Sequence, residues 1–243
     1  MRIVLWTIFL TVTSFAHGQV SLGVIGEPAL NITKIGSTPE RASDSLNNLK
    51  STDYTLSLGL EIRKNIDRFT SITFIPGFYQ SNMMLEKSNL NLFDVVHPEL
   101  PELRDLTVGP EKKAYLSYRQ KYVGLQVLFA KQLQLKLPIN KMSVELGGGM
   151  GIYLKLEDDI RIQTEGFAIK SEYVHIIKEN TGIEVRPYLA QVIATADISY
   201  KATPTVETIA GIKLTAPLTS TTTSVPKVTV YTPALRLGLR FRI

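Results

Sequence analysis

Apolar and polar side chains alternate one by one through a stretch of this chain that also contains four glycines. In residues 144–156, VELGGGMGIYLKL, one series of positions is almost wholly apolar, and the other holds mainly glycine and charged residues. Successive side chains of a β-strand point to opposite faces, so a long strand with one apolar face is predicted. The same alternation recurs over residues 19–33, 52–64, 69–81, 115–131, 187–201, 205–217 and 227–243.

These segments are too long for strands of an ordinary soluble domain. Each is at least 12 residues long, whereas strands in soluble proteins average about five or six residues. A tilted strand needs about 9–11 residues to cross a bilayer. The lengths therefore favour strands that span a membrane and extend beyond it.

The connections between the segments alternate between long and short. An antiparallel up-and-down barrel with short turns at one rim and long loops at the other produces this pattern. The predicted fold is therefore an all-β, eight-stranded antiparallel transmembrane barrel with long extracellular loops and both termini at the short-turn rim. The long polar connections are residues 34–51, 82–114 and 157–186, the short ones are 65–68, 132–140 and 202–204, and residues 218–226 are intermediate.

Charged residues mark the polar face of the segments, together with glycine, serine and threonine. Side chains fill the lumen of an eight-stranded barrel, so we predict that these charges form an ion-pair network there. Gly147, Gly149 and Gly151 are expected to make room for Arg236 and Arg240. The predicted interior network consists of Glu27, Glu61, Arg63, Glu145, Lys155, Glu207, Lys213, Arg236 and Arg240.

Alternation by itself leaves open whether the polar or the apolar face lines the interior of the barrel. If the polar face points inward, the barrel lies in a membrane and Arg236 pairs with an acid such as Glu145 or Glu61. If the apolar face points inward, the chain is a soluble periplasmic lipocalin-like carrier of an apolar ligand. Aromatic residues near strand ends favour the membrane barrel, because such residues form girdles at the membrane interfaces. They are Tyr54, Phe78, Tyr188, Tyr200 and Phe241.

The first residues have the layout of a secretory signal peptide. Arg2 precedes an apolar stretch, residues 3–15, that is too short to cross a bilayer as a helix. We expect residues 1–18 to be a signal peptide and residues 19–243 to form the barrel domain, exported to the cell outer membrane. The chain contains no cysteine, so neither a disulfide nor a lipid-bearing cysteine is expected.

Charge and motifs argue against several classes of function. The net charge is +5, but the basic residues are scattered, so a lipid surface is favoured over nucleic acid as a partner. The glycine run lacks the Gly-Lys-Ser/Thr of a phosphate-binding loop. Beyond the signal peptide the only histidines are His97 and His175, and the acidic run 157–159 is expected to be solvated. We expect no metal, cofactor or catalytic residue. The enzyme alternative is a lipid A-modifying barrel in which His175 acts with Ser171 and Glu172.

Three of the predicted strands have a recognisable pattern: LSYRQKYVGLQVLFAKQL, residues 116–133, the glycine-rich VELGGGMGIYL and the terminal LRLGLRFRI. The first resembles the Y-L-E-I-P-L-L-L-K strand of PorT-like outer-membrane β-barrel proteins of Gram-negative bacteria, and the other two resemble the glycine-rich and terminal strands of that family. The resemblance implies an outer-membrane barrel without shared catalytic residues, and some members of the family are linked to secretion or gliding machinery. The matching positions of the first strand are Tyr122, Val123, Leu125, Val127 and Leu128.

We therefore predict a structural or interaction role at the cell surface, as an accessory to secretion or adhesion. The expected partners are outer-membrane lipid and other envelope or secretion proteins, and the oligomeric state is left open. An eight-stranded barrel whose lumen is filled by side chains has no channel, so no open pore is expected.

Overall fold

The computed structural model describes residues 20–37, 52–88, 113–135, 141–165, 184–223 and 227–243. The expected signal peptide lies outside the described residues, and so do His97 and His175. The predictions made for these residues therefore stay predictions.

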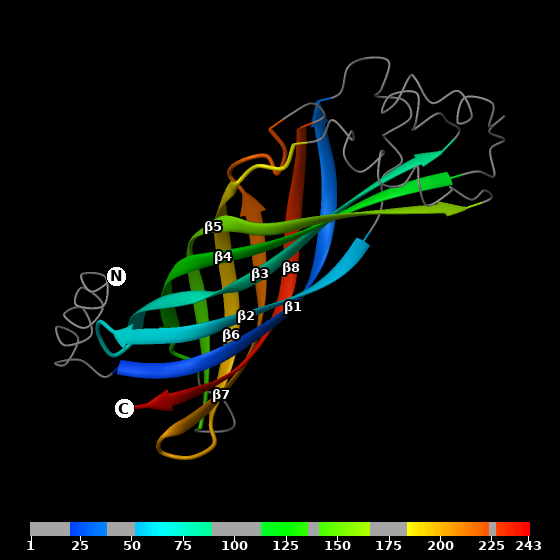
Figure 1. The fold of residues 1–243 in the computed structure, drawn as a ribbon. Coiled ribbons are helices and arrows are strands. Elements are labelled where there is room, and N and C mark those ends of the chain that lie inside the picture. Colours follow the sequence, from blue (N-terminus) through cyan, green and yellow to red (C-terminus); the bar gives the residue numbers. More distant parts are fainter. Residues whose placement is uncertain (1–19, 38–51, 89–112, 136–140, 166–183, 224–226) are drawn as a thin grey trace, which may run out of the picture.

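The predicted eight-stranded antiparallel barrel is confirmed (Figure 1). Each strand pairs antiparallel with the next one along the chain, and β8 pairs with β1 to close the sheet. Among the described residues no helix is long and apolar enough to cross a membrane. The strands are β1 Val20–Ser37, β2 Thr52–Asn65, β3 Thr70–Ser88, β4 Lys113–Leu133, β5 Met142–Glu165, β6 Tyr188–Lys201, β7 Val206–Pro217 and β8 Lys227–Arg242.

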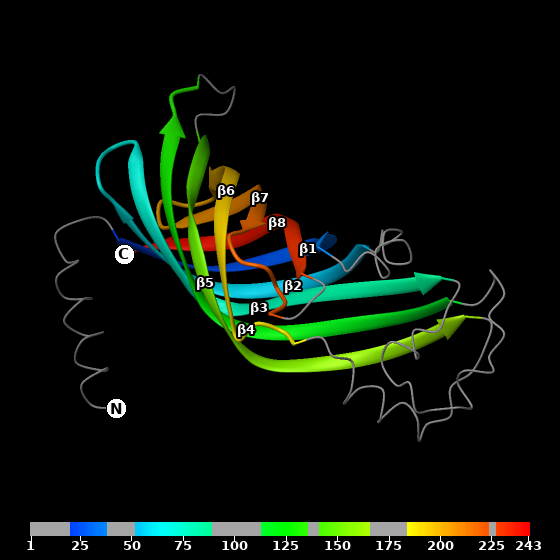
Figure 2. The ribbon, with the colours of Figure 1, turned by 90° about the horizontal axis from the view of Figure 1, so that it is seen from above.

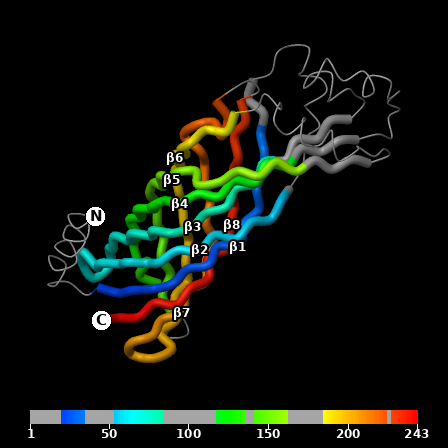
Figure 3. The backbone as a smooth tube through the Cα atoms, viewed as in Figure 1, coloured from blue at the N-terminus to red at the C-terminus, as the bar shows by residue number. Residues whose placement is uncertain are grey.

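The short connections lie at one rim, where β1 also begins and β8 ends (Figure 3). The turn between β2 and β3 is held by Asp67, whose carboxylate accepts hydrogen bonds from the backbone N–H groups of Phe69 and Thr70, each at 2.7 Å. The Phe69 N–H, followed by the groups of Thr70, lowers the pKa of the Asp67 carboxyl because these donors favour its charged form. This rim is called the turn rim below, and the opposite one the loop rim.

At the loop rim β3, β4 and β5 continue beyond the rest of the barrel as a three-stranded sheet (Figure 2). The β3–β4 ladder continues to the pair Ser88–Lys113, and the β4–β5 ladder to the pair Lys113–Glu165. The expected loop boundaries near residues 82 and 157 are therefore wrong, whereas the boundary expected near residue 114 lies within two residues of the start of β4. Backbone hydrogen bonds between adjacent strands do not require alternating side chains, so the ladders extend past the region that the side-chain pattern marks.

The polar face of the strands points into the barrel, and the apolar face points outward. On β2, Glu61 and Arg63 are buried, whereas Leu58 and Leu60 are more than half exposed. A lipocalin-like carrier needs the opposite arrangement, because its apolar face lines the cavity that holds the ligand. The structure contradicts that alternative.

The interior also contains two apolar clusters that the prediction of a polar lumen overlooked. The first comes from β1, β3, β4 and β6, so its side chains meet across the lumen, and consists of Ile25, Ile75, Leu128 and Ile193. The second lies nearer the loop rim and consists of Tyr79, Tyr122, Tyr153 and Leu189. The aliphatic residues stand at inward positions of an otherwise polar series, which is why the alternation alone did not reveal them.

The glycines of β5 make room for an aromatic ring and for backbone. The ring of Tyr153 fills the space beside Gly151, and the backbone of β4 fills the space beside Gly149. Neither Arg236 nor Arg240 is among the nearest atoms at these positions, so the expected role of the glycines was wrong. An aromatic ring that covers a glycine stabilises a curved sheet at the point where the glycine bends it.

Two adjacent glycines provide a matched test of this packing. A Cβ on Gly149 would lie 2.9 Å from the Cα of Leu128 and would also meet the carbonyl of Val127, whereas a Cβ on outward-facing Gly148 meets nothing nearer than 3.7 Å. We expect Gly149→Ala to lower the free energy of unfolding by about 1–3 kcal/mol, and Gly148→Ala to change it by less than about 0.5 kcal/mol. Urea titration in detergent micelles, followed by circular dichroism, measures both. Equal stability of the two variants would contradict the assigned packing.

Candidate functional site

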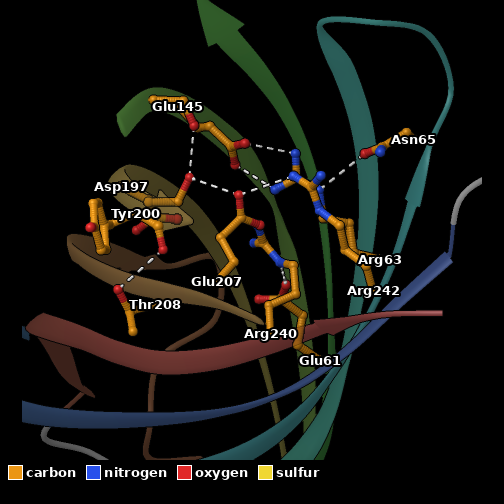
Figure 4. A network of polar contacts seen from close by, with 12 residues as sticks. Glu61, Arg63, Asn65, Glu145, Asp197, Tyr200, Glu207, Thr208, Arg240 and Arg242 are labelled. Atoms are coloured by element: carbon orange, nitrogen blue, oxygen red, sulfur yellow. Dashed lines mark hydrogen bonds and ion pairs between the residues drawn. The ribbon is translucent and has the colours of Figure 1, made fainter. Parts of the chain in front are cut away.

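A network of ion pairs occupies the interior of the barrel (Figure 4). Arg63 on β2 reaches Glu145 on β5 with both terminal nitrogens, Nη1 at 2.5 Å from Oε2 and Nη2 at 2.7 Å from Oε1. Both side chains are about nine-tenths buried. Two parallel hydrogen bonds between a guanidinium and a carboxylate form the strongest type of ion pair, so this contact ties two strands on opposite sides of the lumen.

Arg240 on β8 joins two further carboxylates. Its Nε lies 2.5 Å from Glu61 Oε1, and its Nη1 lies 3.0 Å from Glu207 Oε2. Glu207 also accepts a hydrogen bond from Arg242 Nη2 at 3.3 Å, and the Ser199 hydroxyl lies 3.5 Å from its Oε1. The network thus connects β2, β6, β7 and β8.

Arg236 and Lys213 extend the network past mid-height. Arg236 pairs with Asp197, and its side chain lies 3.4 Å from Glu27 and 3.9 Å from Glu61. Lys213 pairs with the other oxygen of Glu27. Of the acids expected to pair with Arg236, Glu61 is close to it, whereas Glu145 pairs with Arg63. Asp197 was left out of the predicted network, although it stands on the polar face of its segment, at the parity shared by Thr195.

The charges of the network balance when Arg242 at the turn rim is included. An isolated ion inside a protein costs several kcal/mol even after relaxation, so each needs a partner. Five carboxylates face five basic groups, and all of these residues are buried except Arg242, which lies at the turn rim. The carboxylates belong to Glu27, Glu61, Glu145, Asp197 and Glu207, and the bases to Arg63, Lys213, Arg236, Arg240 and Arg242.

Lys155 is the one predicted member that the network does not contain. Its Nζ lies 2.7 Å from Asp158 at the loop rim, where both side chains are partly exposed. The β4–β5 register shifts at this point, with Tyr122 opposite Lys155 and Lys121 opposite Glu157. This bulge brings Asp158 to the face of Lys155, so the lysine pairs locally instead of reaching the interior.

The acidic run 157–159 takes part in three separate ion pairs. Lys155 pairs with Asp158, Lys121 Nζ lies 2.7 Å from Glu157, and Arg161 Nε lies 2.9 Å from Asp159. Within the part of the chain that the structure describes, no group of three or more His, Cys, Asp or Glu side chains could hold a metal ion.

A polar cavity of about 420 Å³ opens into the network at the turn rim. Its walls include Arg63, Glu145, Glu207, Arg240 and Arg242. The carboxylates in this wall already accept hydrogen bonds from guanidinium groups, and the wall contains neither histidine nor cysteine. The arrangement offers charge pairing and hydrogen bonding in the cavity wall.

The outer face of the barrel carries the second functional feature, a continuous band of exposed apolar side chains. Across the middle of the wall no outward-facing position carries Asp, Glu, Lys or Arg, within residues 22–32, 54–62, 72–78, 123–129, 144–156, 188–200, 208–216 and 231–241. Exposed lysines stand at the ends of the band, at Lys121 and Lys131 on β4 and at Lys34, Lys201 and Lys227 on other strands. Soluble monomers rarely expose apolar patches larger than a few hundred Å². The predicted aromatic girdle residues are all exposed on this face: Tyr54, Phe78, Tyr188, Tyr200 and Phe241.

The barrel is similar to solved structures of bacterial outer-membrane and surface proteins. Neisserial surface protein A is 11% identical, with 92% of this chain and 97% of that chain covered and a TM-score of 0.44. OprG of Pseudomonas aeruginosa is 9% identical, with 93% and 97% covered and a TM-score of 0.48. Ail of Yersinia pestis is 13% identical, with 93% and 99% covered and a TM-score of 0.33. At these identities and TM-scores nothing about function follows from the likeness.

No protein-family model and no curated protein sequence matches the chain. The resemblance of its strands to PorT-like proteins therefore stays a prediction.

The Arg63–Glu145 pair provides a test of the interior network. Removing one member strands the other charge, so Arg63→Met should lower the free energy of unfolding by about 3–5 kcal/mol. Adding Glu145→Met should restore part of that loss, because an apolar pair of similar volume replaces a buried ion pair at little cost. Urea titration in micelles measures each variant.

The exposed Lys121–Glu157 pair is the matched control, with both side chains more than half exposed. Lys121→Met should cost no more than about 1 kcal/mol. A loss of stability in Arg63→Met as small as that in Lys121→Met, or a double variant less stable than Arg63→Met, would contradict the network.

Proposed function

We propose that this chain is an outer-membrane β-barrel that crosses the bilayer with its eight strands and has a structural or interaction role at the cell surface. The observation that carries the proposal is the uncharged outer band, which surrounds a barrel whose charges are paired inside. In hydrocarbon a spanning sheet must satisfy every backbone group, and a closed barrel does so. The outward leucines can face hydrocarbon, and the charges are kept away from it inside the barrel.

The height of the band supports the same proposal. Lys121 and Lys131 both face outward on β4 and enclose Val123, Leu125, Val127 and Phe129. Ten residues at about 3.4 Å each, in a strand tilted by about 40°, rise roughly 26 Å along the barrel axis. This matches the apolar band of about 25 Å in known outer-membrane barrels.

The filled interior supports a role other than that of a pore. The cluster of Ile25, Ile75, Leu128 and Ile193 crosses the lumen, and the ion-pair network occupies the interior beside it. Water and ions would have to displace buried apolar side chains and separate buried ion pairs to pass.

The finer parts of the proposal rest on the sequence. The N-terminal pattern supports export by a signal peptide, and the resemblance to PorT-like strands supports an accessory role in secretion or adhesion, with envelope proteins as partners. A non-enzymatic role is likewise a proposal. The two histidines of the expected mature chain, His97 and His175, lie outside the described residues.

Cell fractionation with a pair of variants at Leu237 tests the membrane assignment. The wild-type protein should be recovered in the outer-membrane fraction and migrate differently on a gel before and after heating. Leu237 is 54% exposed, so Leu237→Ala should behave as wild type. Leu237→Arg should cost roughly 2–4 kcal/mol near the bilayer midplane and reduce the amount inserted.

Two results would overturn the membrane assignment. One is recovery of the wild-type protein in the soluble periplasm. The other is a loss of about 2–5 kcal/mol in Leu237→Ala, the cost expected for a leucine in a protein core, with no effect of Leu237→Arg on insertion.

Planar bilayer recordings test the closed lumen. The reconstituted wild-type protein should give no steady current, because aliphatic side chains and ion pairs fill an eight-stranded barrel. A reproducible, long-lived conductance would show that the interior opens and would contradict the role proposed here.

A further inference from the structure

Two prolines weaken the same part of the seam between β1 and β8. The ladder contains the pairs Gly26–Leu237 and Ala29–Ala234 and resumes at Ile32–Tyr231. In this register Pro28 faces Leu235, and Pro233 faces Leu30. Proline has no N–H to donate, so the ladder is interrupted beside both prolines. On their other sides the ladders continue, with Pro28 opposite Leu56 and Pro233 opposite Leu214.

An apolar groove of about 410 Å³ lies on the outer wall at this part of the seam. Its outward-facing side chains belong to β7, β8, β1 and β2, and those of Ile212, Leu214 and Leu235 are each more than half exposed. Tyr54, 78% exposed, lies at the edge of the groove, at the loop-rim end of the apolar series of β2. The apolar lining comes from Pro28, Leu30, Ile212, Leu214, Pro233 and Leu235.

The groove has a closed floor. On the inner side of the seam the Thr232 hydroxyl lies 3.3 Å from Asn31 Oδ1, and Asn31 Nδ2 lies 3.2 Å from the Thr55 hydroxyl. Lys213, which also borders the groove, is buried and paired with Glu27. These contacts join β1, β2 and β8 across the interrupted ladder, so the groove is a depression in the wall and not a passage through it.

We propose that this groove binds one acyl chain of a membrane lipid. The proposal rests on the membrane assignment above, since the groove lies within the apolar band and nearer the loop rim. A depression in a lipid-facing wall leaves its lining atoms without contacts unless a chain enters it. An acyl chain in the groove contacts protein on several of its sides. An acyl chain that lies against the flanking leucines contacts protein on one side only.

The lining favours a hydrocarbon chain over a second protein. Inside a bilayer no hydrophobic effect drives two apolar surfaces together, so protein contacts there rely on small residues that let backbones approach or on polar groups that bond across the contact. Here the surrounding outward positions, such as Leu56, Leu58 and Leu237, are large, apolar and exposed. Tyr54 supplies a phenol at the edge of the groove, at the level where aromatic side chains meet lipid headgroups.

Tryptophan fluorescence can report whether the groove is occupied. Trp6, in the expected signal peptide, is the single tryptophan of the chain, so a tryptophan introduced in the barrel is a specific reporter. Leu235→Trp places it in the groove, and Met150→Trp places it on β5, on the far side of the barrel. The two original side chains are matched in exposure, at 55% and 54%.

Each variant is reconstituted in vesicles of dibrominated phosphatidylcholine, whose bromines quench tryptophan, and palmitate is then added. We expect both variants to be quenched at first. Fluorescence of Leu235→Trp should recover at a palmitate-to-phospholipid ratio about tenfold lower than that of Met150→Trp, a preference of about 1.4 kcal/mol. Leu214→Ala, which removes contacts from the lining, should reduce this difference when combined with Leu235→Trp.

The outcomes separate the groove from the membrane assignment. If neither variant is quenched by brominated lipid, the barrel does not face lipid and the membrane assignment fails. If both are quenched and recover at the same palmitate ratio, the wall faces lipid without a preferred chain site, and the groove proposal is overturned. A third outcome is that brominated lipid quenches Met150→Trp but not Leu235→Trp before palmitate is added, and that the protein can be cross-linked as a dimer. This outcome would show that a second copy covers the groove, and it would also overturn the groove proposal.

Discussion

The pairing of β8 with β1 closes the barrel, and both faces of the wall follow from this closure. It joins the two ends of the chain's sheet, from Ser21–Arg242 at the turn rim to Ser37–Lys227 at the loop rim. A closed sheet has no free edge along its wall, so backbone groups are satisfied without help from water. Closure also creates an inside, and only an inside can hold the charges that alternate with leucine along the strands.

Closure then decides the chemistry of the two faces. Eight strands enclose a lumen narrow enough for side chains from opposite walls to touch, as Arg63 and Glu145 do. Because the charges balance, the interior can exclude water without stranding an ion. Because the middle of the outer wall carries no charged side chain, it can contact hydrocarbon on every strand. The apolar band and the interior network are therefore two consequences of one alternation.

The same closure tolerates local defects when other contacts replace the lost ladder. Pro28 and Pro233 remove donors from the seam, and the contacts of Asn31 with Thr232 and Thr55 hold the wall on its inner side. At the loop rim β3, β4 and β5 leave the barrel together, because each edge of β4 remains paired. The wall is thus continuous at mid-height, whereas at the loop rim, among the described strands, only β3, β4 and β5 extend further.

The candidate site was predictable in composition and not in pairing. Glu61, Arg63 and Arg240 stand at inward positions by parity alone, and the structure buries them. Parity also includes Asp197, which the prediction left out. It cannot anticipate the bulge beside Lys155, because a bulge arises from the register of two strands and shifts the face of every residue beyond it.

The eight strands, their two faces and the order of turns follow from the sequence, because the period of two is a local property of the chain. Only the closed barrel brings Arg63 to Glu145, Arg236 to Asp197 and the ring of Tyr153 over Gly151. These contacts join strands far apart in the sequence or depend on the curvature of the closed wall. Which side chains meet across a lumen follows from the tilt and stagger of the closed sheet, and no single strand carries that information.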